Sequence, residues 1–440
     1  MTQIATGAES YAAQFAASAQ AAALPDALAS LRDDAFHCFD RLGFPTTRIE
    51  EWRFSNVAPI AETPFVTPMT APSYGQAALD AFPLPRLCGP ELVFVNGWFM
   101  PALSTTDGLP AGVKVRSLAE VVQSDPETVI PHLGQLARIE NHAFTALNTA
   151  FLRDGAVIEV GKNVVVDAPI HLLFITASDD GPVLSQPRAL VLAGANSQVR
   201  VLESHAGDGA APYLNNPVTE VVVADGAVVD HYAIVRETET GFRLGGLFAR
   251  LGRASNVSSH AITLSGAIAR HEASVVLDGE GGVCALNGLY LGNGGQLVDN
   301  QTTIDHAKPH CESHELYKGI LSGRSRAVFN GKIIVRLDAQ KTDAKQSNKA
   351  LLLSEHAQVT TKPQLEIFAD DVKCTHGATV GQLDAESLFY LRSRALSEPQ
   401  ARQLLIHAFA ADLLSHIKID AVRRQLDTLL TERLPVGAGG

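Results

Sequence analysis

Two segments in the C-terminal half of the chain carry residue types that bind metals or handle sulfur. In the first, residues 368–379, Cys374 and His376 are separated by a single residue. An extended backbone would project both side chains from one face, and a thiolate beside an imidazole suits iron, zinc or sulfur transfer. Two ligands do not close a zinc or iron–sulfur site, so the others must come from elsewhere in the fold or from another chain. The alternative is a buried structural cysteine beside a hydrogen-bonded histidine.

The second segment gathers three imidazoles and a thiol within nine residues: His306, His310, Cys311 and His314. This composition is typical of a metal site. Pro309 interrupts the segment, so one continuous helical face cannot bring the rings together. The alternative is a set of polar residues on a turn, some of which cap the ends of strands.

The elements that position these residues are short β-branched runs between about residues 155 and 385, punctuated by Gly, Asn and Asp. An apolar residue, a small or Gly-rich turn and a second apolar residue six places on recur at Val223/Val229, Leu251/Val257, Leu277/Val283, Leu291/Leu297 and Leu353/Val359. Leu192/Val199 and Leu321/Val328 match with one extra residue. The recurrences are one or two units of about 14 to 15 residues apart, as stacked short strands produce. The repeat predicts a β-solenoid, specifically a parallel β-helix.

The regions outside this core have different sequence patterns. Residues 1–60 read as a helical N-terminal region, with one helix opening at Pro25 and closing at Gly43. Residues 61–154 form a mixed N-terminal segment in which Asn96-Gly97 predicts a hairpin. We assign residues 155–390 to the β-helix core and residues 391–440 to a C-terminal helical hairpin.

The C-terminal hairpin has clear start signals. Ser397, Pro399 and Gln400 supply an N-cap, an N-terminal proline and a capping-box glutamine. Two short helices cannot bury all of the apolar surface that follows. The hairpin is therefore expected to dock on the solenoid end or on a partner through a stripe that includes Leu404, Leu405, Phe409 and Leu413.

Composition excludes several classes of function. The chain has 440 residues, and 35 basic against 47 acidic residues give a net charge of −12, which argues against a nucleic-acid binder. No apolar run approaches the ~18 residues needed to span a bilayer, and no basic region precedes Arg32, so neither a membrane segment nor a secretory signal is expected. Five widely spaced cysteines fit a reducing compartment, and the default location is the cytoplasm.

Standard catalytic motifs are missing from the sequence. It has no P-loop, no G-x-S-x-G elbow, no H-E-x-x-H and no G-x-G-x-x-G after a strand. We therefore expect no ATP site in this chain. A solenoid of this length without such motifs indicates a platform rather than a self-contained enzyme.

Four segments resemble the SufB/SufD family of iron–sulfur cluster assembly proteins. Residues 369–379, which hold Cys374 and His376, look like the family signature, and residues 45–54 resemble its N-terminal element. Residues 317–319 and 341–348 resemble its core. The length, the helical N-terminus and the few cysteines are more similar to the SufD branch than to the SufB branch.

The resemblance implies a right-handed parallel β-helix with helical flanks, acting as a non-catalytic scaffold in a complex with a SufB-like chain and a SufC-like ABC-type ATPase. A nascent, transient iron–sulfur cluster would be built at the interface with the SufB-like chain. The family's functional histidine falls on His376 and its neighbouring cysteine on Cys374. The C-terminal helices would dock the ATPase. Complexes of the family are also associated with reduced flavin, for which no residue here indicates a site. Whether a homodimer forms where the SufB-like chain is absent is a question that the sequence leaves open.

Two other solenoid classes compete with this interpretation. A β-helix lyase or hydrolase acting on polysaccharide is usually secreted and rich in aromatic sugar platforms, whereas only 6% of this chain is aromatic. A hexapeptide-repeat acyltransferase needs a strict six-residue period, which the sequence lacks. The carbohydrate-active enzyme remains the main alternative.

Overall fold

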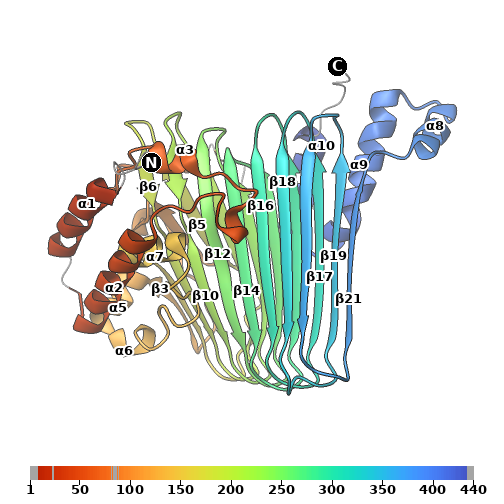
Figure 1. Cartoon of the computed structure of the whole chain (residues 1–440). Coiled ribbons are helices and arrows are strands. Elements are labelled where there is room, and N and C mark those ends of the chain that lie inside the picture. The colour runs from red at the N-terminus through yellow and green to blue at the C-terminus, as the bar shows by residue number, and fades with distance from the viewer. Residues whose placement is uncertain (1–7, 22–23, 81, 83–86, 88, 434–440) are drawn as a thin grey trace.

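The computed structural model describes residues 8–21, 24–80, 82, 87 and 89–433. Parts of three predicted regions fall outside the described residues: 1–7 and 22–23 of the N-terminal region, 81, 83–86 and 88 of the mixed segment, and 434–440 of the C-terminal hairpin. The rest forms a parallel β-solenoid with helices at its N-terminal and C-terminal parts (Figure 1). The predicted mainly β fold class is confirmed.

Two long sheets make up the solenoid. Sheet I contains β1 (Glu91–Val95), β2 (Trp98–Phe99), β5 (Ile170–Ala177), β8 (Gln198–Asp208), β11 (Val228–Arg236), β13 (Asn256–Ser265), β15 (Val283–Gly292), β17 (Glu312–Leu321), β19 (Asp343–Leu352) and β21 (Lys373–Gly381). Sheet II contains β3 (Val113–Ser117), β4 (Gly155–Val160), β7 (Arg188–Ala193), β10 (Val218–Val223), β12 (Gly241–Leu251), β14 (Ile268–Leu277), β16 (Leu297–His306), β18 (Arg326–Val335) and β20 (Gln358–Ile367), with β6 (Val183–Ser185) and β9 (Tyr213–Asn215) alongside.

From β4 and β5 onward, each coil supplies one strand to each sheet, so neighbouring strands within a sheet run parallel, whereas β2 and β3 pair antiparallel with β1 and β4. Leu247 pairs with Ala273 of the next coil, and Gly331 pairs with Pro363. Partners in adjacent strands are thus about two units of the sequence repeat apart. The repeat marks the corners between the sheets: Val223 ends β10, and Val229 lies in β11 after a turn that Gly226 makes at a φ of 69°.

The solenoid interior is filled by alternate side chains of both sheets. Val229, Val257 and Cys284 form successive rungs from sheet I, and Leu251 and Leu277 face them from sheet II. Each is at most 1% exposed, and full burial of an aliphatic side chain stabilises the fold by about 1.5–3 kcal/mol. The β-branched runs thus become strands because their inward rows pack against each other.

Helices cover the outer faces of both sheets. The N-terminal helices are α1 (Ala8–Ala21), α2 (Asp26–Leu42), α3 (Ala58–Glu62), α4 (Gln76–Asp80), α5 (Leu118–Ser124), α6 (Pro126–Val129) and α7 (Ala143–Ala150), with 3₁₀ turns η1 (Glu50–Trp52) and η2 (Pro101–Leu103). Phe39 of α2 and Leu147 of α7 belong to one apolar cluster with Leu244 and Ile268 on the outside of sheet II. The N-terminal helices are therefore anchored on the solenoid itself.

The C-terminal helices are α8 (Ala385–Ser393), α9 (Glu398–Ser415) and α10 (Asp420–Arg433). The predicted capping box of α9 is present, because Ser397 and Gln400 bond to each other's backbone N–H groups. Leu413 and Leu414 pack against Ile262 and Leu289 on the outside of sheet I. The hairpin thus docks along the flank of the solenoid, while α8 and the start of α9 project away from it (Figure 1).

Two local features differ in detail from the sequence-based expectation. The core strands end at Gly381, and α8 begins at Ala385, inside the range assigned to the core. The predicted hairpin around Asn96-Gly97 forms, with Val95 opposite Trp98, but β1 also pairs in parallel with β5. The mixed segment therefore contributes strands to the solenoid. No helix among the described residues is long and apolar enough to cross a membrane.

Candidate functional site

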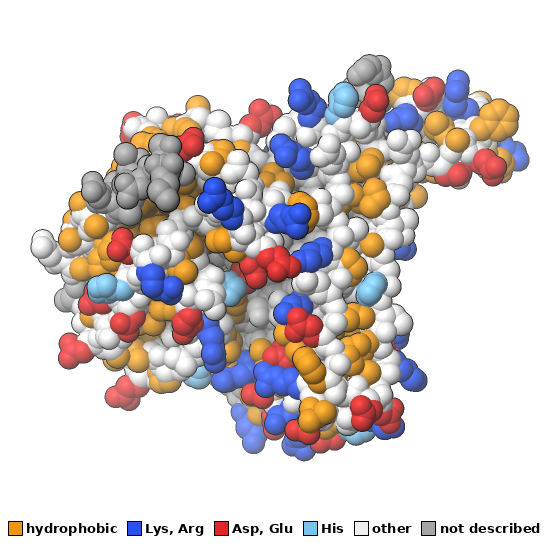
Figure 2. Space-filling view, viewed as in Figure 1, with side chains coloured by type: hydrophobic (Ala, Val, Ile, Leu, Met, Phe, Trp, Pro, Cys, Tyr) orange, Lys and Arg blue, Asp and Glu red, His pale blue; other side chains and the backbone are white. Residues whose placement is uncertain are grey.

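The last coil of the solenoid has open strand edges. β20 pairs only with β18, and β21 only with β19, within the described part of the chain. Apolar side chains are exposed along this coil, including Ile367, Phe368 and Val380. Figure 2 shows hydrophobic side chains on the strands at this end of the molecule. An open edge with apolar neighbours is a ready template for another strand.

Cys374 and His376 lie on β21 and share its inner face. Cys374 pairs with Ala344 and packs in an apolar cluster with Val335, and His376 is two residues further along. Cys374 is half-buried, and this burial raises the pKa of its thiol. His376 is exposed. The predicted shared face of the two side chains is present, at the open end of the solenoid.

A row of buried polar groups leads to His376 along the inside of sheet I. Glu315 of β17 is opposite Gln346 of β19, which is opposite His376. The Nε2 of Gln346 donates a 2.7 Å hydrogen bond to Oε2 of Glu315. Burial raises the pKa of Glu315 to about 7. These two residues were not identified from the sequence as part of a site.

The histidine-rich segment is divided between inside and outside. His306 is fully buried at the end of β16, where Nε2 lies 2.9 Å from the hydroxyl of Ser313, and Cys311 is also buried. His310 is exposed on a turn, and His314 is half-exposed on the outside of β17. No group of three or more His, Cys, Asp or Glu residues in the described ranges is arranged to hold a metal ion. This geometry fits the alternative of polar residues on a solenoid turn.

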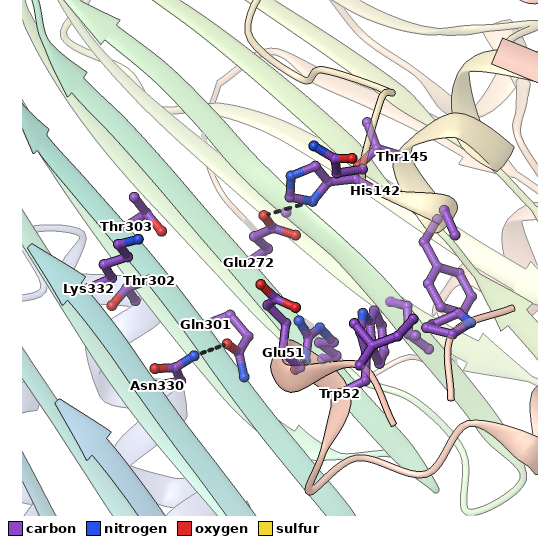
Figure 3. Close-up of a pocket in the computed structure, with 18 of the residues that line it drawn as sticks. Glu51, Trp52, His142, Thr145, Glu272, Gln301, Thr302, Thr303, Asn330 and Lys332 are labelled. Carbon is purple, nitrogen blue, oxygen red and sulfur yellow. Dashed lines mark hydrogen bonds and ion pairs between the residues drawn. The ribbon is translucent and has the colours of Figure 1, made fainter. Parts of the chain in front are cut away.

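A groove lies between the N-terminal region and the outside of sheet II. It encloses a cavity of about 800 Å³, with residues 42–52 on one wall, residues 141–145 on another and strands β12 to β20 as its floor. Figure 3 shows Gln301, Asn330 and Lys332 on the strands of the floor, where Asn330 bonds to Gln301, and Glu51 and His142 on the walls. Acidic and basic side chains gather around this hollow in the space-filling view (Figure 2).

Pairs of opposite charges in the groove tie its walls to its floor. His142 lies 3.3 Å from Glu272, and hydrogen bonding to that carboxylate raises the pKa of the imidazole. Lys362 of β20 contacts Glu50 at 2.5 Å. Arg270 lies 3.8 Å from the ring centre of Trp52. The family-like segment 45–54 is therefore held on the sheet by contacts with strands that are remote from it in the sequence.

A further polar cluster is sealed inside the solenoid. Oε1 of Glu203 accepts a 2.7 Å hydrogen bond from Thr219, and Glu203 also lies 3.2 Å from the imidazoles of His205 and His231. All four side chains are at most 3% exposed. Burial lowers the pKa of His205 to about 4. The low pKa of His205 makes the neutral imidazole the favoured form inside the solenoid.

The predicted partner-docking residues divide by helix face. Leu413 is fully buried against sheet I, and Phe409 is partly buried beside Lys318, whose Nζ lies 4.8 Å from the ring centre. Leu404 is 48% exposed. On α8, Phe389 and Tyr390 are 76% and 56% exposed. The face open to a partner is therefore made by α8 and the first turns of α9.

Comparisons with known proteins agree with these features. The protein-family model for the SufBD N-terminal region matches residues 6–172. The protein-family model for the SufBD core domain, described as SUF system FeS cluster assembly, matches residues 174–409.

Curated relatives match over most of their length. The chain is 35% identical to an iron-sulfur cluster assembly SufBD family protein of Synechocystis sp. over 91% of this chain and 89% of the relative. It is 32% identical to the iron-sulfur cluster assembly protein SufD of Escherichia coli over 90% and 91%, and 28% identical to SufD of Bacillus subtilis over 68% of each. With both family regions matched in order along the solenoid and its flanks, the chain belongs to the SufBD family of iron–sulfur cluster assembly proteins.

Proposed function

We propose that this chain is the SufD-type scaffold subunit of a SufBCD-type complex and helps build a nascent iron–sulfur cluster at its interface with a SufB-like chain. The cluster is the cargo of the complex, and the chain itself is non-catalytic. ATP hydrolysis belongs to a SufC-like ABC-type ATPase, because this sequence has no P-loop. The free thiols of Cys38, Cys284, Cys311 and Cys374 support assembly in the reducing cytoplasm.

The observation that carries the proposal is the open last coil with His376 on its inner face. The unpaired edges of β20 and β21 offer backbone donors and acceptors to a strand of another chain. A SufB-like chain paired there would place its own side chains beside His376 and Cys374. A ligand set shared in this way explains why only two candidate ligands occur in this segment. A second copy of this chain can use the same edge where no SufB-like chain is present.

His376 is suited to bind the cargo directly. A neutral imidazole binds iron through one nitrogen and can be oriented through the other. His376 is exposed on the open edge strand, whereas Cys374 is half-buried with a raised pKa. We assign the direct ligand or proton-handling role to His376 and a supporting role to Cys374.

The exposed helical surface supports an ATPase-docking role. Phe389 and Tyr390 of α8 and Leu404 of α9 are exposed on the part of the hairpin that projects away from the solenoid. Exposed apolar side chains gathered on one surface mark a protein interface.

Reduced flavin does not fit the groove beside Trp52. A flavin ring needs an accessible aromatic or apolar surface to stack on. Arg270 covers the ring of Trp52, and the ring centres of Trp52 and Phe144 are 5.4 Å apart. Two pairs of opposite charges, His142 with Glu272 and Lys362 with Glu50, also occupy the groove. We therefore place no flavin contact in this groove.

The experiment that tests the proposed function compares His376→Ala with His314→Ala in the purified three-protein complex. His314 is an exposed strand histidine on the outer face and serves as the matched control. We expect His376→Ala to lose iron and acid-labile sulfide while complex assembly and ATPase activity persist, and His314→Ala to retain all three. Wild-type cluster content in His376→Ala would show that cluster building depends on the partner chain and not on His376.

A further inference from the structure

The row of polar side chains inside sheet I ends at His376. Parallel register makes Glu315, Gln346 and His376 consecutive members of this row. Strands in a sheet lie about 4.8 Å apart, so side chains in register on one face are neighbours. Glu315 and Gln346 are 3% exposed, and His376 is the exposed last member.

The amide of Gln346 has a defined orientation. Its Nε2 donates a 2.7 Å hydrogen bond to Oε2 of Glu315. The carbonyl Oε1 of Gln346 therefore faces away from Glu315. This atom is buried and has no hydrogen-bond partner within the described residues. A buried acceptor is expected to find a donor, and the next member of the row is His376.

The opposite sheet holds the Gln346 amide in place. A Cβ added to Gly331 of β18 would lie 2.2 Å from Nε2 of Gln346. The amide thus packs directly on the backbone of β18, in space that only glycine leaves free. Glu315 fixes one end of this amide, and Gly331 fixes its position across the interior.

We propose that Gln346, held by Glu315 and Gly331, is a positioning residue for His376. In the assembled complex, Oε1 of Gln346 accepts the N–H of one ring nitrogen of His376. The other ring nitrogen then faces the cargo with its lone pair free. Metal-binding histidines commonly donate their second ring N–H to an oxygen atom, which fixes the tautomer and the ring orientation. This inference rests on the proposed role of His376 as a ligand.

The first test replaces Gln346 by Leu in the purified three-protein complex. We expect cluster content, measured as iron and acid-labile sulfide, to fall by about 10-fold, the usual effect of removing such an orienting partner. The nitrogen coupling to the bound iron, measured by pulsed EPR, should weaken in Gln346→Leu and disappear in His376→Ala.

Asn348→Leu is the matched control. Asn348 is a buried amide two residues further along the inner face of β19, and it accepts a 3.1 Å hydrogen bond from the hydroxyl of Tyr290. It is not in register with His376, so its loss should leave the nitrogen coupling unchanged. An equal loss of coupling in Asn348→Leu would show general core damage and overturn the inference.

Two further variants separate orientation from charge. Glu315→Gln keeps an oxygen that accepts from Gln346 and should retain the nitrogen coupling, whereas Glu315→Leu should weaken it. Gly331→Ala adds a methyl group at the amide while leaving the rest of the row intact, and it should weaken the coupling as Gln346→Leu does. If the complex that carries Gln346→Leu fails to assemble, the nitrogen coupling in Gly331→Ala tests the positioning role of Gln346.

The outcomes distinguish this inference from the proposed function. Wild-type cluster content in His376→Ala overturns both. Loss in His376→Ala together with wild-type content and coupling in Gln346→Leu and Gly331→Ala overturns only the positioning role of Gln346.

Discussion

The two ends of the solenoid are built in opposite ways. At the N-terminal end, the β1–β2 hairpin and β3 close the interior, where Phe94 lies 5.5 Å from Phe99 and 5.2 Å from Phe174 between ring centres. At the C-terminal end, β20 and β21 have open edges, and the inner row finishes on Cys374 and His376. Both ends continue the same two sheets.

This difference separates stability from assembly. The closed end adds helices α2, α5 and α7, whose apolar side chains pack on β4, β7 and β12. At the open end, the outer edges of β20 and β21 have no strand partner in the described part of the chain and are available to a strand of another chain. A solenoid is stabilised mainly by contacts between neighbouring coils, so one end can stay open without unfolding the rest.

Removing a buried charge at the closed end should have the largest effect. Arg188 lies 2.5 Å from Glu220, both side chains are fully buried, and Glu220 also accepts backbone N–H groups of Gly134 and Leu136. Arg188→Ala should lower the free energy of unfolding by about 3–5 kcal/mol, because Glu220 would remain buried without its partner. Urea unfolding measures this change. A loss below about 1 kcal/mol would contradict the expected stabilisation of the closed end by the Arg188–Glu220 pair.

Truncation on α9 should distinguish its two faces. Leu413 is fully buried against sheet I, and Leu404 on the same helix is 48% exposed. Leu413→Ala should lower the free energy of unfolding by about 2–5 kcal/mol, and Leu404→Ala should change it by less than about 0.5 kcal/mol. Only Leu404→Ala should weaken binding to the ATPase, measured in a pull-down, while its free energy of unfolding stays normal. Equal effects on stability would refute the assigned faces.

Acid should lower the stability of the solenoid. Burial lowers the pKa values of His205, His260 and His306 to about 4, below the usual value near 6.5. Their neutral forms stabilise the fold fully above pH 6.5, and this contribution is lost as pH falls from 6.5 toward 4 at about 1.4 kcal/mol per pH unit for each histidine.

Glu315 acts in the opposite direction within part of this window. Its raised pKa of about 7 makes the folded state bind a proton more readily than the unfolded state between pH 7 and 4.5, which offsets about one histidine. Urea unfolding at a series of pH values should show a net loss of stability with acid. His260→Gln should reduce the slope of the free energy of unfolding against pH by the equivalent of one proton. An unchanged slope would contradict the lowered pKa of His260.

A proline on the open edge should have the smallest effect on stability. Lys373 N–H bonds to the Thr342 carbonyl that precedes β19, so alternate residues of β21, including Ala378, direct their N–H groups to the open side. Ala378→Pro removes one outward donor and should change the free energy of unfolding by less than about 1 kcal/mol while abolishing binding to the SufB-like chain. Thr379→Pro, which removes a donor to β19, is the destabilising control. Normal partner binding by Ala378→Pro would argue against strand pairing there.

Local signals in the sequence predicted much of the fold. The corners of the solenoid, the caps of α2 and α9 and the hairpin at Asn96-Gly97 each depend on a few adjacent residues. Strand register was less accessible: Val257 is in register with Cys284 and not with Val283, the corresponding member of the next repeat pair. A one-residue shift changes the face of every side chain in a strand, and turn lengths between coils vary.

The candidate site was only partly accessible for the same reason. Cys374 and His376 are two positions apart and could be recognised together. Glu315, Gln346 and His376 belong to three successive coils, and they form a row only when those coils are stacked. The groove contact between Trp52 and Arg270 joins regions with no local relation in sequence.

Hydrogen–deuterium exchange on the full chain, alone and bound to the SufB-like chain, tests the central claim most directly. We expect binding to slow the exchange of backbone amides in β20 and β21 and to leave exchange in β1 to β4 at the closed end unchanged. Unchanged exchange in β20 and β21, or protection confined to the closed end, would contradict the assignment of the open coil as the assembly interface.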